Sequence, residues 1–173
     1  ISIILLFSFL LATEVSGVVE GQWTLENSPY EVVGDITINP YTSLSIDPGV
    51  EVIFMGVYEI EVSGEIHADG TQDLPITFSG YDGNNWNGFD LHYNTAPSSF
   101  AWCNFSDTAQ NFLSFYYSYD TTIDHCTFNN YSNDAIHSED NYSVLSISNS
   151  SFSTSSSVRS IEAINTFLVI ENT

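Results

Sequence analysis

The chain has 173 residues, which is enough for one domain or two small ones. It carries 22 Asp and Glu residues against a single Lys or Arg residue, Arg159, so its formal net charge at pH 7 is −21. This charge excludes nucleic acid as a partner, because phosphate binding needs several basic side chains, and it disfavours docking on anionic lipid. Because 43% of the residues are hydrophobic and 14% aromatic, we expect a packed core rather than a disordered acidic tail.

The chain opens with an apolar run over residues 1–12 that only Ser2 and Ser8 interrupt. Such a run is too short to cross a bilayer, which needs about 20 residues, but it fits the apolar region of a signal peptide. We therefore predict that residues 1–17 are a signal peptide that lacks its start, with cleavage after Gly17. The mature chain would then be secreted or displayed at the cell surface, without membrane insertion. A buried strand or an uncleaved anchor is the alternative.

From Gly21 onward, short stretches alternate between apolar and polar residues, and the 3.6-residue spacing of an amphipathic helix is missing. Turn sequences such as Asp47-Pro48-Gly49 separate the stretches. In chain order the first of them are 36–38, 44–46, 50–54, 60–62, 66–68 and 76–78. This pattern predicts an all-β domain of many short strands.

Three columns of apolar residues recur with one shared period of 23–24 residues. The first column is Phe105, Phe128 and Phe152, which Phe54 and Phe78 extend upstream if a short insertion precedes Phe105. The second column is Phe100, Ile123, Ile147 and Ile170, and the third is Phe89, Leu113, Ile136 and Ile161. A coil of this length with three strands predicts a parallel β-helix, in which each coil returns about 4.8 Å above its start. We expect six or seven coils.

Several stretches also resemble a known family. They run SPYEVVGDITI over 28–38, LSIDPGVEVIF over 44–54, VSGEIHADGT over 62–71, PITFS over 75–79 and NWNGF over 85–89. These stretches are similar to the opening coils of secreted right-handed parallel β-helix repeat proteins of the pectin-lyase-like superfamily, common on bacterial surfaces. The resemblance implies a single-chain right-handed solenoid over residues 18–173. Because Thr173 falls inside the repeat pattern, we expect the domain to be truncated there and to continue in a longer parent chain.

Cys103 and Cys126 occupy equivalent positions on neighbouring coils. Two interpretations are open, a disulfide between the coils or two buried thiols. Neighbouring parallel strands lie about 4.8 Å apart, whereas a disulfide prefers Cβ atoms about 3.8 Å apart. The spacing therefore favours thiols.

A polar strip is predicted on the strand that follows Trp86, where alternation places Asp90 and His92 on the outer surface. Counting on by the repeat period gives two columns on this surface. The first column continues from Asp90 to Ser114, His137 and Glu162, and the second continues from His92 to Tyr116 and Glu139. The candidate catalytic residues are Asp90, His92, His137, Glu139 and Glu162. Carboxylates of Glu139 and Glu162 on a diagonal of about 8 Å would suit an inverting glycosidase. The competing interpretation is that any acidic solenoid shows carboxylates and an occasional histidine on its surface.

Two further sets of residues are candidates for binding. Tyr93, Tyr116, Tyr117 and Tyr119 are candidates for stacking on sugar rings. The carboxylates of Asp134, Glu139 and Asp140 offer oxygen ligands for calcium, with a solvated turn as the alternative. No other cofactor is expected.

The chain's composition decides between the functions that the resemblance implies. Relatives that are pectate lyases use Arg or Lys as base and charge clamp, whereas this chain has one Arg and no Lys. We therefore predict a non-catalytic scaffold for adhesion or glycan contact, with a polysaccharide or cell-surface glycan as partner. The alternative is a polysaccharide-degrading enzyme, a glycoside hydrolase rather than a lyase.

Overall fold

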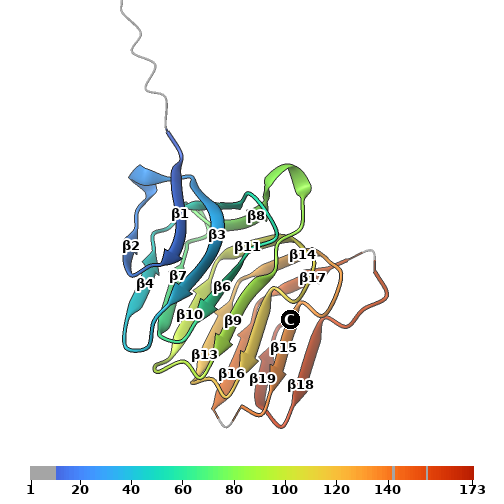
Figure 1. Cartoon of the computed structure of the whole chain (residues 1–173). Coiled ribbons are helices and arrows are strands. Elements are labelled where there is room, and N and C mark those ends of the chain that lie inside the picture. Colours follow the sequence, from blue (N-terminus) through green and yellow to red (C-terminus); the bar gives the residue numbers. More distant parts are fainter. Residues whose placement is uncertain (1–10, 142, 155) are drawn as a thin grey trace, which may run out of the picture.

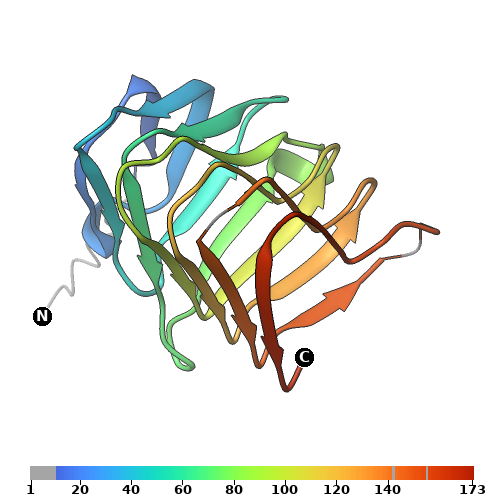
Figure 2. The same cartoon turned by 90° about the horizontal axis from the view of Figure 1, so that it is seen from below.

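The chain winds into a parallel β-solenoid of about six turns, which confirms the predicted all-β fold class (Figures 1 and 2). The computed structural model describes residues 11–141, 143–154 and 156–173. In Figure 2 the coils follow one another from the N-terminal to the C-terminal end of the stack. Short 3₁₀ turns interrupt the strands at Leu25–Asn27 and Tyr81–Gly83.

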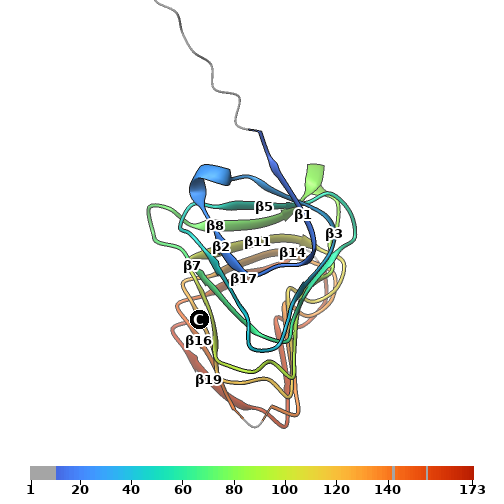
Figure 3. The same cartoon turned by 60° about the vertical axis from the view of Figure 1, so that its left-hand side comes forward.

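Each full coil contributes one strand to each of three faces (Figure 3). The first face consists of β5 (Glu51–Phe54), β8 (Ile76–Gly80), β11 (Cys103–Thr108), β14 (Thr127–Tyr131) and β17 (Ser151–Ser153). The second face consists of β6 (Glu59–Val62), β9 (Gly88–His92), β12 (Leu113–Tyr116), β15 (Ile136–Glu139) and β18 (Ile161–Ile164). The third face consists of β2 (Gly21–Trp23), β4 (Ser43–Ile46), β7 (Glu65–Asp69), β10 (Ser98–Ala101), β13 (Thr121–Asp124), β16 (Val144–Ser148) and β19 (Phe167–Glu171). The long strand β3 (Tyr30–Ile38) starts both the first and the second face.

The segment of the predicted signal peptide is described only in part. Residues 1–10 lie outside the described residues, whereas Thr13–Val18 form β1, which pairs in parallel with β3. Cleavage after Gly17 would remove most of this strand, and the cleavage itself stays a prediction. In the described ranges the structure contains no helix that is long and apolar enough to span a membrane.

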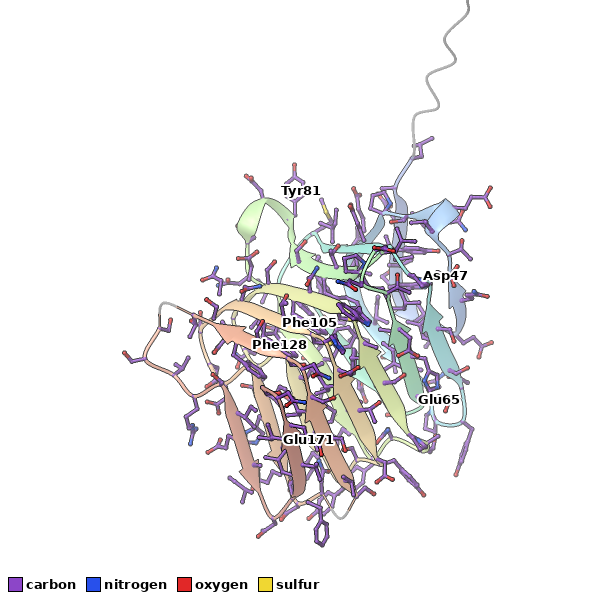
Figure 4. The ribbon with its side chains drawn as sticks, turned by 180° about the vertical axis from the view of Figure 1, so that it is seen from behind. Asp47, Glu65, Tyr81, Phe105, Phe128 and Glu171 are labelled. Carbon is purple, nitrogen blue, oxygen red and sulfur yellow. The ribbon has the colours of Figure 1, made fainter. Side chains whose placement is uncertain are left out.

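The core is built from stacked columns, because alternate residues of each strand point inward and equivalent residues of neighbouring coils lie in register. Phe78, Phe105, Phe128 and Phe152 form the first column, with ring centroids 5.1, 4.8 and 4.9 Å apart. Figure 4 shows Phe105 and Phe128 side by side, whereas Tyr81 points away at the tip of its turn. The columns that start at Phe100 and Phe89 also pair as predicted.

The predicted extension of the first column to Phe54 is wrong. Phe78 pairs with Val52, and Phe54 pairs with Gly80. The spacing between these two coils is therefore two residues longer than the period, and a shift by two keeps the same residues inside. Phe54 stacks instead on Trp86, with ring centroids 4.0 Å apart, so the segment before β9 fills the core at this level.

Cys103 and Cys126 are buried free thiols, which confirms the favoured interpretation. The Cys103 Sγ donates to the carbonyl oxygen of Ala68 at 3.2 Å. Burial raises the pKa of the Cys103 thiol well above its usual value, so the thiol belongs to the core and is no nucleophile.

Candidate functional site

The outer side of the second face carries the predicted polar strip in the predicted register. Asp90, Ser114, His137 and Glu162 pair in succession from β9 to β18, and Glu61 of β6 precedes them. His92, Tyr116 and Glu139 form the column beside them. The repeat period was thus sufficient to bring these side chains onto one surface.

An aromatic cluster, which we call the aromatic corner, lies where the second face ends. It consists of His92, Tyr93, Tyr116 and Tyr117. The Tyr93 ring stacks on His92 at 4.6 Å and on Tyr117 at 5.1 Å, while Tyr116 meets His92 edge-on at 5.2 Å. Tyr93 remains 61% exposed, so this stack presents an aromatic surface to solvent. The fourth candidate, Tyr119, lies two residues beyond Tyr117, and its backbone amide donates to Asn94 Oδ1 at 2.8 Å.

The backbone of this corner adopts a left-handed conformation on four successive coils. Continuing the strand register places Tyr93, Tyr117, Asp140 and Asn165 at equivalent positions, with φ of 50, 50, 53 and 49°. Asp and Asn adopt this conformation readily, whereas a bulky side chain is uncommon there. The two C-terminal coils therefore meet the backbone requirement at lower cost than the two coils that carry tyrosine.

A second cluster, which we call the charged cluster, lies on the last two coils of the second face and consists of Asp134, His137, Glu139, Arg159 and Glu162. The buried Asp134 carboxylate accepts from Arg159 Nε and Nη2, both at 3.2 Å, and Arg159 also pairs with Glu162. His137 lies between two carboxylates, with Nδ1 3.0 Å from Glu162 and Nε2 3.7 Å from Glu139. The hydrogen bond to Asp134 raises the pKa of Arg159 above its usual value.

Two predicted site arrangements differ from what the structure brings together. Glu139 and Glu162 both contact His137, so an imidazole occupies the place between them where an inverting glycosidase would hold its water. The proposed calcium ligands do not converge, because Asp134 precedes β15 whereas Glu139 and Asp140 lie at its far end. Five extended residues span about 16 Å. Asp140 instead accepts from Asn165 Nδ2 at 2.9 Å.

A polar cavity of about 310 Å³ lies at the N-terminal end of the strip, and Glu59, Asp90, Gln110 and Asn111 contribute to its lining. Burial, followed by repulsion from Asp35, Asp90 and Glu61, raises the pKa of Glu59. Burial also raises the pKa of Asp90, although His92 opposes the rise. Counting along the sequence does not find Glu59, because the longer connections before and after β8 place it 29 residues before its partner Gly88 and hide the period.

The raised pKa of Asp90 predicts how Asp90→Asn alters stability. Because the folded state holds the proton more tightly than the unfolded state, the ionised carboxylate destabilises the fold at neutral pH. We expect Asp90→Asn to increase the free energy of unfolding by about 0.5 kcal/mol at pH 7. This gain should shrink as the pH falls through the raised pKa and vanish below about 3.8, the usual value of an aspartate.

Urea unfolding of the parent chain and of Asp90→Asn between pH 7 and pH 3 measures this effect. Asp73→Asn, in an exposed turn, is the control and should change little at any pH. A gain from Asp90→Asn that is the same at pH 3 and pH 7 would contradict the role of the carboxylate's ionisation.

Comparisons with protein families, curated proteins and solved structures find no match for this chain. The solenoid itself agrees with the β-helix fold that the stretches 28–38 and 44–54 imply.

Proposed function

We propose that this chain is a secreted or cell-surface β-helix module of pectin-lyase-like type that binds a glycan at its aromatic corner without cleaving it. The exposed Tyr93 ring, which stacks on Tyr117, suits the apolar face of a sugar ring, and a tyrosine phenol group can bond to sugar hydroxyls. Histidine and carboxylates on the adjoining strip supply further hydrogen-bonding groups. Because the net charge is −21, a neutral glycan is favoured over a polyanionic one.

The observation that carries this proposal is the residue choice at the left-handed corner. Asp140 and Asn165 suit that conformation, yet the equivalent positions hold Tyr93 and Tyr117. A left-handed conformation costs an ordinary side chain about 1–2 kcal/mol. The stacking of Tyr93 on Tyr117 offsets part of this cost but leaves the Tyr93 ring mostly exposed. A ligand that covers the ring would account for the tyrosine.

Tyr93→Asn tests the proposal, because asparagine fits the backbone and removes only the aromatic ring. We expect the free energy of unfolding to stay within about 1 kcal/mol of the parent chain, since relief at the backbone balances the lost stacking. Binding to an array of neutral and acidic polysaccharides should fall at least about tenfold, which corresponds to one lost stacking contact of about 1.4 kcal/mol. Affinity electrophoresis and calorimetry on the best ligand measure it.

Trp102→Asn is the matched control. Trp102 also has a left-handed backbone, with φ of 50°, and stacks on His125 at 4.1 Å, but it lies at the corner between the third and first faces. The Trp102→Asn variant should therefore bind glycan as tightly as the parent chain does. Equal losses in both variants, or no binding to any polysaccharide by the parent chain, would contradict a glycan-binding role for the aromatic corner.

The alternative, a polysaccharide hydrolase, has one observation in its favour. Glu59 and Asp90 share a polar cavity, and burial raises the pKa of each, as a general acid requires. A reducing-sugar assay on the same polysaccharides distinguishes the two functions. We expect no product, and product formation that disappears in Asp90→Asn, or in Glu139→Gln and Glu162→Gln, would establish the enzyme instead.

A further inference from the structure

Three side chains of the charged cluster converge on one point from two neighbouring coils. Asp134 precedes β15, His137 lies in β15 and Glu162 lies in β18, and one ligand atom of each lies within 4.8 Å of the other two. In a tetrahedral zinc site, bonds of about 2.0–2.2 Å place the ligand atoms about 3.4 Å apart. Small side-chain movements would therefore bring the three atoms to coordination distance.

The imidazole of His137 already has the surroundings of a metal-binding histidine. Its Nδ1 faces Glu162, and its Nε2 lies 3.7 Å from Glu139 on the other side. A histidine that binds a metal through one nitrogen commonly donates its other N–H to a carboxylate, which fixes the ring and increases its basicity. Glu139 is placed to accept that hydrogen bond when Nδ1 binds an ion.

The buried carboxylate of Asp134 already requires a cation beside it, and the guanidinium of Arg159 is that cation. The Asp134 side chain is 5% exposed and needs a positive partner, which is Arg159. The Arg159 side chain is 63% exposed, so its guanidinium can move into solvent without opening the core. A divalent ion between Asp134 and Glu162 would neutralise both carboxylates, whereas one guanidinium neutralises only one.

We propose that Asp134, His137 and Glu162 form a zinc-binding site for which Arg159 and the metal ion compete. One imidazole nitrogen with two carboxylate oxygens suits Zn²⁺, whereas calcium sites are built from oxygen ligands alone. Water would complete the coordination. The site lies on β15, β18 and the segment before β15, whereas the aromatic corner follows β9 and β12, and zinc binding does not depend on glycan binding.

Calorimetric titration of ZnCl₂ into the intact, EDTA-treated chain tests the site. We expect one ion per chain, and a tenfold excess of CaCl₂ should not displace it. Arg159→Gln should tighten zinc binding about tenfold, because the competing cation is gone, whereas His137→Gln and Glu162→Gln should each weaken it at least about tenfold. Visible absorption of the Co²⁺-loaded chain reports whether nitrogen and oxygen ligands surround the metal.

His125→Gln is the matched control for the histidine variants. His125 Nδ1 pairs with Asp124 at 2.8 Å, a comparable histidine–carboxylate contact at another corner, so its loss should not change zinc affinity. Circular dichroism shows whether each variant is folded, and the tighter binding of Arg159→Gln cannot arise from misfolding. The proposal is overturned if neither the parent chain nor Arg159→Gln binds zinc, or if binding survives unchanged in both folded variants His137→Gln and Glu162→Gln.

Discussion

Phe128→Ala is expected to lower the free energy of unfolding by about 3–5 kcal/mol. Phe128 is fully buried and lies between Phe105 and Phe152, with ring centroids 4.8 and 4.9 Å away and nearly parallel planes. The substitution removes two stacking contacts at once and leaves a cavity that closes poorly, since strand pairing with β11 and β17 fixes the backbone of β14 on both sides. Urea unfolding followed by circular dichroism measures the loss.

Two further variants show whether the loss of stability comes from the stacked position of Phe128 or from the loss of any aromatic ring. Phe167→Ala removes a ring that is 65% exposed, so the free energy of unfolding should change by no more than about 0.5 kcal/mol. Phe128→Leu keeps most of the buried volume and should cost less than Phe128→Ala. If Phe128→Ala and Phe167→Ala had equal effects, Phe128 would not lie in a stacked core.

Gly88→Ala is expected to lower the free energy of unfolding by more than about 3 kcal/mol. Gly88 has φ of 85°, which costs a residue with a Cβ about 1–2 kcal/mol. The added Cβ would also collide with the backbone carbonyl oxygen of Asn111 and lie 2.8 Å from that of Phe112. These carbonyls belong to the next coil, so β9 and β12 would have to separate where Glu59 and Asn111 line the polar cavity.

Gly83→Ala measures the cost of the left-handed backbone without a collision, so its difference from Gly88→Ala gives the contribution of the collision. Gly83 has a similar φ of 72°, but an added Cβ would meet no atom within 4 Å. We expect Gly83→Ala to cost only the backbone contribution of about 1–2 kcal/mol. Thermal and urea unfolding of the two variants compare them directly, and equal losses would show that the close approach of the neighbouring coil is unimportant.

The strand pattern by itself determined the solenoid and most of its polar strip. In a parallel stack, residues one period apart face the same way, so the Phe105 column could be derived by counting along the chain. The same counting placed His137 over Asp90 and Glu139 over His92. Spacing also favoured free thiols at Cys103 and Cys126, because neighbouring strands are too far apart for an easy disulfide, and the structure confirms them.

Only the tertiary structure decided what happens at corners and where the period changes. Extra residues between β5 and β8 shifted Phe54 out of its expected column, and the longer segment between β8 and β9 concealed the pairing of Glu59 with Gly88. Likewise, turn conformation brought Arg159 onto Asp134 and set Tyr93 in a left-handed backbone. Strand pairing repeats with a fixed spacing and can be read by counting, whereas the direction of a corner side chain depends on backbone angles and on inserted residues, which the alternation of apolar and polar residues does not encode.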